Sequence, residues 1–594
     1  MSRLPLLFAA ASALTLAACA TQPVPPAAAT AAAVPQDDTT TYGLYLAGHA
    51  ARDAGALDVA ADYLGRASLS EGGPPYLRRK AFTAALLAGD VTRAAVLAPD
   101  APADGDEDDS AAALRRLGVL VQGVEAMAQG RYKDAVALLD GPGVGYPHRA
   151  AALLLAPWAE AGAGAYANAV NAVPVGNDPL AQFVARLNQA QLFERAGRNG
   201  EAEAVYKQLL TNGDTAGIVS VAYGVFLERR GRSNDAQALY RAALARNIGD
   251  PALGGALARA SRHGQAPSLP TIRQSAAEAL ILPAARAMSE KQNEVALGYL
   301  RLALRLNPNH DEAWVLVGDL LAVAGDAAGA RAAYGHPKLG SPRYQSARDK
   351  LAWSYQNGGQ GDEALRLARE TALAMPGSRQ AKTTLAELLR ENNDYEESAT
   401  VLTQMIEQPG AQPDWRLYYL RASAYDGAGD WTKEEADLQT ALKLRPDSPT
   451  LLNYLGYAWI DRGEHLQDAL AMIQRAAVVE PQSGEVMDSL GWAYYRLGDY
   501  QSAVAKLEEA ASLEAADADV NNHLGDAYWR VGRKIEAQFQ WRRVLSLEPS
   551  DTLRAQVQAK LASPLGPDAP TPPPAATPAP PPADPAPAVA AKAS

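Results

Sequence analysis

Apolar residues in the C-terminal half of the chain follow a pattern that repeats every 34 or 35 residues. Each repeat has a leucine and a glycine side by side, with an aromatic residue three positions after the glycine: Leu455, Gly456 and Trp459; Leu490, Gly491 and Tyr494; Leu524, Gly525 and Tyr528. Apolar residues at intervals of three and four are typical of a helix with one buried face. A repeat of this length has room for two helices and a turn, so the pattern predicts a series of helix–turn–helix units.

Small residues mark the places where the two helices of each unit are expected to touch. The glycine lies in the first helix, and an alanine, Ala469, Ala503 or Ala537, lies at the matching place in the second. Pro481 and Pro549 close two of the units, because proline lacks the N–H that would continue a helix. This arrangement resembles the tetratricopeptide repeat, a helix–turn–helix unit of about 34 residues.

The same register extends backward through the C-terminal half. It predicts eight units between residues 277 and 551, which begin at Ala277, Asp311, Gln345, Arg379, Trp415, Pro449, Gly484 and Ala518. A closing helix is expected at residues 552–563. In the unit that begins at Trp415, Glu434 replaces the usual alanine. This replacement predicts a unit that is loosely packed or bent.

The N-terminal half fits the pattern less well. Units are expected to begin near Thr41, Pro75, Arg116 and Phe183, with one more about 34 residues later. The register breaks at residues 99–109 and again at 252–276, where we expect an irregular connection that acts as a hinge or alters the curvature. The predicted fold is all-α: a right-handed superhelical solenoid of tetratricopeptide units, with a degenerate array at 41–251 and a regular array at 277–563.

The start of the chain has the features of an export signal. Arg3 supplies a positive charge, and the apolar stretch at 4–15 is too short to span a bilayer as a helix. Residues 16–19, Leu-Ala-Ala-Cys, then resemble the bacterial lipobox, in which lipid is attached to the cysteine and the chain is cut before it. The resemblance implies that residues 1–18 are a lipoprotein signal peptide and that Cys19 carries the lipid anchor. An ordinary signal peptide with a chance cysteine is the alternative.

The residues beside the array are expected to be unstructured. Residues 19–40 are rich in Ala, Thr and Pro, which is typical of a flexible tether. Ala20 stands where aspartate is the usual inner-membrane retention signal in enteric bacteria, so the resemblance implies the periplasmic face of the outer membrane. Residues 564–594 carry twelve prolines, which predicts a disordered tail or polyproline II. Binding of this tail in an aromatic groove is the less favoured interpretation.

The composition of the chain mainly excludes certain classes of ligand. The 594 residues carry a net charge of -12, and an acidic chain without a basic block is a poor nucleic-acid binder. One cysteine excludes a disulfide framework, and seven scattered histidines leave little scope for a metal site. We therefore expect no metal, no cofactor and no nucleic acid as ligand.

Motifs of catalytic chemistry are also missing from the sequence. Residues 104–108 alternate in the way an EF-hand loop begins, but Asp109 and Arg115 stand where glycine and glutamate are required, so an acidic loop is the better interpretation. Residues 141–145, Gly-Pro-Gly-Val-Gly, match no nucleotide-binding motif and are expected to form a turn. No span outside the array is long enough for a catalytic domain. These observations predict a protein that is not an enzyme.

The first helix of a tetratricopeptide unit lines the concave groove of the array through its positions 2, 5, 9, 12 and 13. In the last three units these positions combine aromatic rings with amide and charged groups, which suit the binding of a peptide backbone or carboxylate. The predicted partner-binding groove consists of Asn453, Tyr457, Asp488, Trp492, Tyr495, Arg496, Asn522, Asp526, Trp529 and Arg530. Ile460 and Asp461 occupy positions 12 and 13 of their own unit and are expected to lie beside these residues. The alternative is that these aromatic residues pack against neighbouring helices, as Trp459, Tyr494 and Tyr528 are expected to do.

Two adjacent units carry a more specific resemblance. Residues 453–473 read N-Y-L-G-Y-A-W-I-D-R-G-E-H-L-Q-D-A-L-A-M-I, and residues 488–504 read D-S-L-G-W-A-Y-Y-R-L-G-D-Y-Q-S-A-V. They resemble a widespread group of bacterial tetratricopeptide-repeat outer-membrane lipoproteins. This group includes the adaptors that bind and activate periplasmic carboxyl-terminal processing proteases. The resemblance implies a scaffold or adaptor whose partners are periplasmic proteins or peptides.

A second interpretation stays open at this point. Tetratricopeptide lipoproteins also serve as scaffolds in exopolysaccharide secretion, such as that of alginate or Pel, and in the assembly of envelope complexes. The neighbouring gene would separate the two, because a protease favours the adaptor and a glycosyltransferase favours the secretion scaffold.

Overall fold

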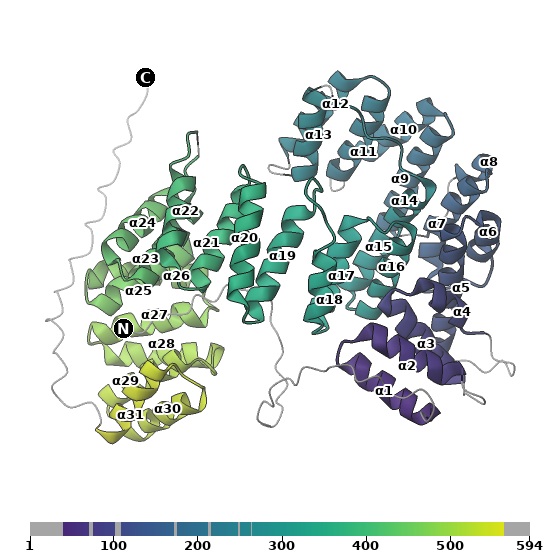
Figure 1. Cartoon of the computed structure of the whole chain (residues 1–594). Helices are drawn as coiled ribbons and strands as arrows, with labels where there is room; N and C mark the ends of the chain where they lie inside the picture. Colours follow the sequence, from purple (N-terminus) through teal and green to yellow (C-terminus); the bar gives the residue numbers. More distant parts are fainter. Residues whose placement is uncertain are drawn as a thin grey trace, which may run out of the picture. The chain divides into compact units, whose positions relative to one another are not determined.

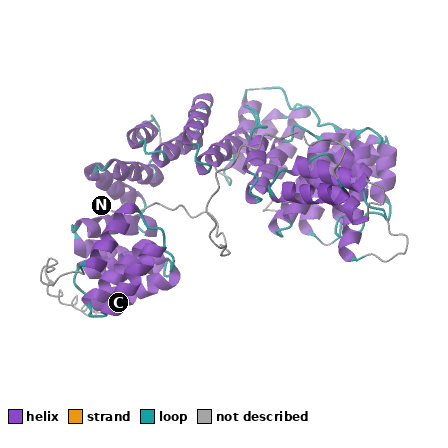
Figure 2. Ribbon diagram, turned by 60° about the horizontal axis from the view of Figure 1, so that its bottom comes forward, coloured by secondary structure: helices purple, strands orange, loops and turns teal. Residues whose placement is uncertain are grey.

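The computed structural model describes residues 40–563 apart from 70–74, 101–107, 172–174, 177, 212–215, 247–249, 263 and 411. The predicted signal peptide, the proline-rich tail, nearly all of the tether and most of the acidic loop lie outside the described residues. Regular structure within this part of the chain is helical throughout, as predicted (Figure 2). It forms two compact units, the N-terminal unit (40–375) and the C-terminal unit (376–563).

The N-terminal unit contains helices α1 to α20 (Figure 1). Their bounds are α1 Thr41–Asp53, α2 Leu57–Leu69, α3 Pro75–Ala88, α4 Val91–Leu97, α5 Asp109–Ala128, α6 Tyr132–Asp140, α7 Arg149–Gly162, α8 Tyr166–Ala169, α9 Pro179–Arg195, α10 Asn199–Leu210, α11 Ala216–Arg229, α12 Ser233–Leu244, α13 Pro251–Ser261, α14 Ile272–Ala279, α15 Ile281–Ser289, α16 Asn293–Leu306, α17 Asp311–Val323, α18 Ala327–Tyr334, α19 Tyr344–Asn357 and α20 Gly361–Ala374.

The C-terminal unit contains helices α21 to α31. Their bounds are α21 Arg379–Glu391, α22 Tyr395–Ile406, α23 Trp415–Ala428, α24 Trp431–Leu444, α25 Pro449–Arg462, α26 Leu466–Val479, α27 Gly484–Arg496, α28 Tyr500–Leu513, α29 Ala518–Arg530, α30 Lys534–Ser546 and α31 Asp551–Ala562.

The predicted repeat register agrees with the helices from α17 onward. The first helices of the predicted units, α17, α19, α21, α23, α25, α27 and α29, begin at the expected residue or one residue away from it. The closing helix is α31, also within one residue of its expected start. Gly491 shows why the register depends on small residues. A Cβ atom placed there would lie 2.5 Å from Leu507 Cγ, so a larger residue would force α27 and α28 apart.

The unit expected to begin at Ala277 differs from the prediction. A break at Leu280 separates α14 from α15, so the first helix of this unit begins at Ile281. Pro283 explains the break. It has no N–H to donate to the carbonyl of Ala279, and its ring crowds that carbonyl.

Residues 252–276 are less irregular than expected. Most of them lie in α13 and in the first part of α14, and only 264–271 run without regular structure between the two helices. The boundary between the two compact units lies at Met375 and Pro376 instead. The helices at 277–375 therefore pack with the N-terminal unit, although they share the repeat register of the C-terminal helices.

The first helices of two N-terminal units begin earlier than the sequence pattern predicts. α5 begins at Asp109, where Asp108 caps the helix by accepting from the Ala111 N–H at 2.7 Å. α9 begins at Pro179, next to the capping residue Asp178. The expected starts at Arg116 and Phe183 were wrong because the caps, and not the repeat register, determine where these helices begin. The glycine-rich segment at 141–145 is a turn between α6 and α7, as predicted.

The unit that begins at Trp415 is well packed, in contrast to the prediction. Ala422 of α23 and Leu438 and Ala441 of α24 share a fully buried cluster. Glu434 is only 3% exposed. Burial, followed by the nearby charge of Asp426, raises the pKa of Glu434 to about 8, so the carboxyl group is largely protonated at neutral pH.

The N-terminal unit covers one of its own faces with a later part of its chain. After α13 the chain turns back, and α14 contacts α7 and α9 while α16 contacts α3, α4 and α5. Arg305 of α16 donates to both carboxylate oxygens of buried Glu125 on α5, at 2.7 and 2.9 Å. The hydroxyl of Tyr299 and Nδ1 of buried His148 share a hydrogen bond of 2.7 Å. These contacts tie α16 to helices that precede it by more than a hundred residues.

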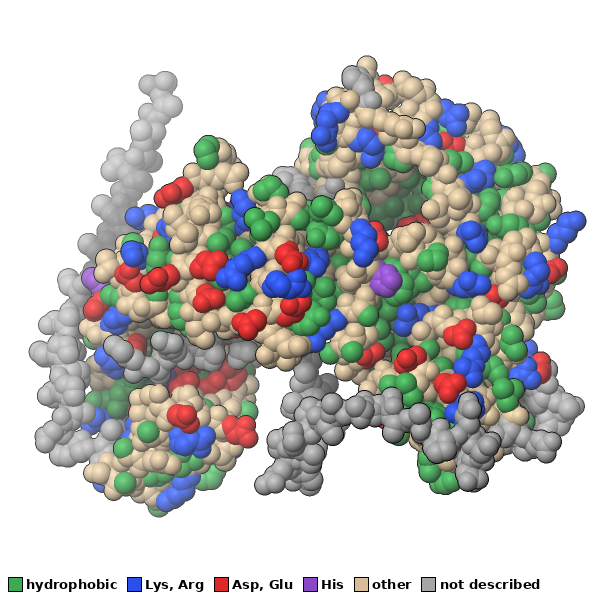
Figure 3. Space-filling view, in the orientation of Figure 1, with side chains coloured by type: hydrophobic (Ala, Val, Ile, Leu, Met, Phe, Trp, Pro, Cys, Tyr) green, Lys and Arg blue, Asp and Glu red, His purple; other side chains and the backbone are tan. Residues whose placement is uncertain are grey.

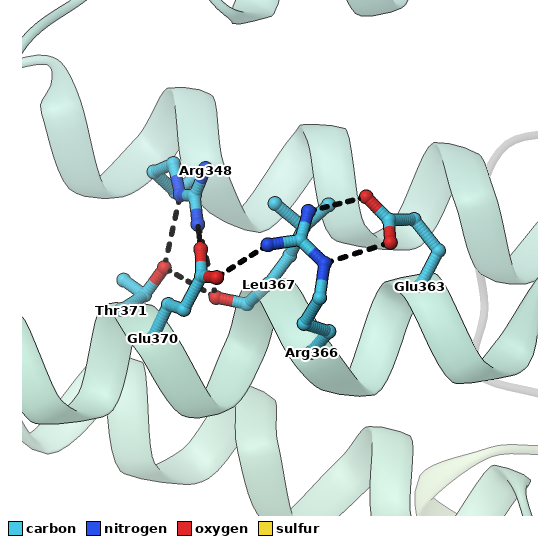
Figure 4. Close-up of polar contacts among 6 residues, drawn as sticks. All are labelled: Arg348, Glu363, Arg366, Leu367, Glu370 and Thr371. Atoms are coloured by element: carbon cyan, nitrogen blue, oxygen red, sulfur yellow. Dashed lines mark hydrogen bonds and ion pairs between the residues drawn. The ribbon is translucent and has the colours of Figure 1, made fainter.

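Surface ion pairs connect neighbouring helices of the array. On α19, Arg348 donates to the Thr371 hydroxyl at 3.1 Å and to the carboxylate of Glu370 at 2.9 Å, both on α20 (Figure 4). Glu370 also pairs with Arg366, which pairs in turn with Glu363. On the C-terminal unit, Figure 3 shows acidic and basic side chains interspersed over the visible face around α22 to α24. Such pairs on a helix surface contribute about 0.3–0.5 kcal/mol each, so they adjust stability without determining the fold.

No helix within the described ranges is both long and apolar enough to cross a membrane.

Candidate partner-binding groove

The face of the C-terminal unit that was predicted to bind a partner is formed by α25, α27 and α29. α27 contacts both α25 and α29, whereas the second helices of these units lie further apart. The array therefore curves toward its first helices, which line the concave side. All ten predicted groove residues lie on these three helices.

The position-5 residues lie deeper than the sequence suggested. Asn453, Asp488 and Asn522 are all buried. Asn453 Nδ2 donates to Glu485 Oε1 at 3.4 Å, while its buried Oδ1 has no hydrogen-bond partner among the described residues. These polar groups form the floor of the groove, and they connect neighbouring helices within the array.

His523 is a titratable groove residue that the sequence prediction missed. Its Nδ1 lies 2.9 Å from Asp488 Oδ2, and both side chains are buried. Burial disfavours the charged ring, but the carboxylates of Asp488, Asp519 and Asp526 outweigh this effect and raise the pKa of His523. His523 follows a position-5 residue, and no feature of the repeat pattern marks it as a groove residue.

Lys560 occupies the last part of the groove from outside the repeats. Its Nζ donates to Asp526 Oδ2 at 2.7 Å and to Asn522 Oδ1 at 2.8 Å. Asp526 also accepts from Trp541 Nε1 at 3.0 Å. Two of the predicted groove residues are therefore held by the closing helix α31. The repeat pattern could not indicate this lysine, because α31 lies outside the repeats.

Three rings form a stack in the middle of the groove. Trp492 lies between Tyr495, at a centroid distance of 4.6 Å and 7° between planes, and His523, at 4.2 Å and 17°. Arg530 Nε donates to the Tyr495 hydroxyl at 3.3 Å. Trp492 Nε1 is buried and has no partner in the part of the chain that the structure describes.

Trp492, Tyr495 and Trp529, three aromatic residues of the predicted groove, are half-buried, and so they expose part of each ring. They also pack against the core of their own units, because Trp492 contacts the cluster around Ile460 while Tyr495 and Trp529 contact the cluster around Trp541. A place in the groove and packing against neighbouring helices, the two interpretations of the sequence, therefore do not exclude each other here. The three residues combine a structural role with an accessible edge.

The remaining predicted groove residues also differ in how far they are exposed. Tyr457 is half-buried, and burial followed by the charge of Asp488 raises its pKa. Arg496 donates to the backbone carbonyl of Asp461 at 2.8 Å, which orients its guanidinium group. Ile460 is fully buried in the core and does not line the groove, although position 12 predicted that it would.

The aromatic residues that lie three positions after the repeat glycine pack as expected. Tyr528 is buried, and its hydroxyl donates to Glu508 Oε1 at 2.7 Å. Trp459 donates to Glu435 Oε1 at 2.9 Å and packs against the clusters of two neighbouring units. Tyr494 is half-buried between two core clusters. No group of His, Cys, Asp and Glu that could hold a metal ion occurs within the described residues.

Comparison with known proteins supports the repeat architecture. Residues 268–548 match the family model described as tetratricopeptide repeat. A TPR repeat-containing protein of Pseudomonas aeruginosa, PA4667, is 30% identical over 113 residues, which is 19% of this chain and 19% of that protein. The comparison therefore covers less than two thirds of the relative.

The comparison with solved structures gives matches of low identity and low TM-score. The Cut9–Hcn1 hetero-tetramer of the APC/C is 14% identical, with 88% of this chain and 96% of that chain covered and a TM-score of 0.35. A tetratricopeptide repeat protein from Parabacteroides merdae is 15% identical, with 42% and 98% covered and a TM-score of 0.35. MamA from Desulfovibrio magneticus RS-1 is 19% identical, with 29% and 94% covered and a TM-score of 0.26.

The repeat register, the helix pairs and the family match over residues 268–548 agree with one another. Arrays of this family are protein-interaction scaffolds, and their stacked units present extended concave surfaces. The described part of the chain is an all-α repeat solenoid, and its residues 268–548 match the tetratricopeptide-repeat family model.

Proposed function

We propose that the chain is a non-catalytic scaffold or adaptor that binds partner proteins through the concave face of α25, α27 and α29. The stack of Tyr495, Trp492 and His523 carries this proposal. It places partly exposed aromatic rings beside Arg530 and beside a buried donor, Trp492 Nε1, that lacks a partner among the described residues. Aromatic and arginine side chains dominate the binding energy of protein interfaces.

The N-terminal unit offers a less accessible face for a partner than the C-terminal unit does. Its helices α3, α4, α5, α7 and α9 are in contact with α14 and α16 of the same unit. A partner that used this face would have to displace the ion pair between Arg305 and buried Glu125. On the C-terminal unit, the corresponding face of α25 and α27 carries no such helix of the unit, and α31 covers only its last part.

We further propose that Cys19 carries lipid and holds the protein on the periplasmic face of the outer membrane. The lipobox-like residues 16–19 and the absence of any other cysteine support this proposal. The resemblance of residues 453–473 and 488–504 to adaptor lipoproteins favours a periplasmic processing protease as partner. The alternative partner is an exopolysaccharide secretion or envelope-assembly complex, and purification of the anchored protein with its bound partners distinguishes the two.

Replacing both Trp492 and Tyr495 by alanine is expected to weaken partner binding at least thirtyfold. The two rings supply the accessible part of the stack, and loss of an anchor costs about 2 kcal/mol or more. Binding is measured with the full chain and with the partner recovered by co-purification, and helical content and hydrogen exchange of α27 are measured on the same samples.

The matched control for this variant is alanine at Ile535 and Phe539. Both side chains lie exposed on α30, at 84% and 60%, away from the groove. The control is expected to bind normally. Equal binding by both variants would place the interface elsewhere on the chain. Loss of protection in α27 would show that the stack is needed for the fold of its unit.

Replacing Cys19 by alanine is expected to release the protein from the membrane fraction. The variant lacks the thiol to which the lipid would be attached, and no other cysteine is present. Membrane and soluble fractions are compared by immunoblotting, together with the mass of the N-terminal peptide. A variant that stays in the outer-membrane fraction at the wild-type level would contradict the anchor without affecting the groove proposal.

A further inference from the structure

A cavity of about 280 Å³ lies among the first helices of the N-terminal unit. Its lining residues come from α1, α2, α3, the start of α5, and α16. It is remote in sequence from the C-terminal groove, and neither the repeat pattern nor the proposed function accounts for it.

The more buried part of the lining is aliphatic. Leu64, Ala84 and Leu87 are buried, and Leu57 and Leu114 are half-buried beside them. Among the described residues that line the cavity, none carries a side-chain amide. Its neutral hydroxyl residues are Tyr76, Thr83 and Ser110, and Thr83 already donates to the carbonyl of Arg79 at 3.1 Å. The leucines and Ala84 leave an apolar surface that suits a hydrocarbon chain.

Charged groups occupy the more exposed part of the lining. Arg79 is half-buried and Lys80 is exposed, and neither forms an ion pair in the described part of the chain. Arg52 contacts only exposed Asp53, at 3.5 Å. Asp108 and Glu294 are the carboxylates of the lining, and Arg79 and Lys80 are its two cations that have no ion pair among the described residues.

His49 on α1 lies near two of these cations, Arg52 and Lys80. Its Nε2 is buried and has no hydrogen-bond partner among the described residues. Burial, followed by the charges of Arg52 and Lys80, lowers the pKa of His49. An anion bound beside these two cations would remove the repulsion that they exert on the ring.

We propose that this cavity binds a monocarboxylate amphiphile, a molecule of the fatty-acid type, with its chain against the leucines and its carboxylate held by Arg79 and Lys80. A carboxylate supplies the ion pair that Arg79 and Lys80 lack among the described residues, and a guanidinium group holds a carboxylate through two parallel hydrogen bonds. The proposal does not depend on the partner groove, since the cavity lies entirely within the N-terminal unit.

The test is calorimetric titration of the full chain with decanoate, with Cys19→Ser in every sample so that no attached acyl chain competes. Decan-1-ol and decyltrimethylammonium have the same chain with a neutral or a cationic head. Decanoate is expected to bind, and the other two are expected to bind at least tenfold more weakly. Equal binding of all three would reduce the site to a nonspecific apolar surface and overturn the proposal, as would no binding of decanoate.

Neighbouring arginines supply the matched variants. Arg79→Ala and Lys80→Ala are each expected to weaken decanoate binding about tenfold, the loss of roughly one charged hydrogen bond. Arg78 pairs instead with Asp100 at 3.1 Å and with the carbonyl of Val96 at 3.2 Å, so Arg78→Ala is expected to bind normally. An equal loss in all three variants would show a general effect of surface charge and overturn the assignment.

A second variant tests the apolar part without changing any charge. Leu114→Trp would fill the cavity and is expected to abolish binding, while Leu46→Trp, at an exposed position of α1, should leave it unchanged. Helical content and the melting temperature confirm that each variant is folded. Unchanged decanoate affinity in a folded Leu114→Trp protein would place the ligand outside this cavity.

Discussion

Replacing Lys560 by methionine is expected to destabilise the end of the C-terminal unit by about 3–5 kcal/mol, because it leaves a buried carboxylate without its cation. Asp526 is 5% exposed, and Lys560 Nζ is the only cation that contacts it among the described residues. After the substitution, the N–H of Trp541 would be its single remaining donor of those in the structure. Removal of a whole buried charge pair is far less harmful than removal of one partner.

The measurement is hydrogen exchange of α29 and α31 in the full chain. The free energy of opening α29 and α31 should fall by about 3–5 kcal/mol. The free energy of opening distant helices should change little, because a solenoid unit contacts only its neighbours. The double variant Lys560→Met, Asp526→Asn is expected to recover most of the loss. Lys433→Met, which removes an exposed pair with Asp430, serves as the control and should change stability by less than about 1 kcal/mol. Equal protection in the Lys560 and Lys433 variants would contradict the predicted role.

Replacing Glu434 by glutamine is expected to stabilise the unit of α23 and α24 by about 3 kcal/mol at pH 7, since one pKa unit corresponds to roughly 1.4 kcal/mol. The pKa of Glu434 is raised from 4.5 to about 8, first by burial and then by Asp426. In the unfolded chain this group loses its proton near pH 4.5, whereas in the folded chain it holds it to about pH 8. The wild-type unit therefore loses stability as the pH rises between these two values.

The stability of the glutamine variant lacks this dependence. Its advantage over the wild type should be close to zero at pH 4.5 and should grow up to about pH 8, as measured by hydrogen exchange of α23 and α24 at several pH values. Glu396→Gln, at an exposed position of α22, should show no such growth. A constant difference between the Glu434 variant and the wild type across this range would show that Glu434 ionises normally in the fold.

The groove illustrates how far a repeat pattern can be used to predict a site. It placed Trp492, Tyr495 and Arg530 on one face, because helical spacing determines which side chains share a face. It did not predict the depth at which those side chains lie. Asp488 became part of a buried pair with His523, and Asp526 became the partner of Lys560, because the neighbouring units and the closing helix supply groups that cover them.

The same limit applies to the boundary between the compact units. The register continues unchanged through α17 and α19, yet the helices up to Met375 pack with the N-terminal unit. Pro283 could be read as a helix breaker from the sequence. The course of the chain after that break could not, since α16 packs on surfaces of α3 and α5 that are far away in the sequence.

The amino-acid sequence by itself determined the helix pairs, their register and the all-α solenoid. It could do so because each unit is specified by contacts between helices that lie within about 34 residues of one another. Tertiary structure alone decided which faces remain open. The ion pair between Arg305 and Glu125 joins residues 180 positions apart, and the pair between Lys560 and Asp526 joins a helix outside the repeats to one inside them. Such contacts depend on how the curved array brings distant surfaces together. The local pattern of apolar residues does not predict that curvature.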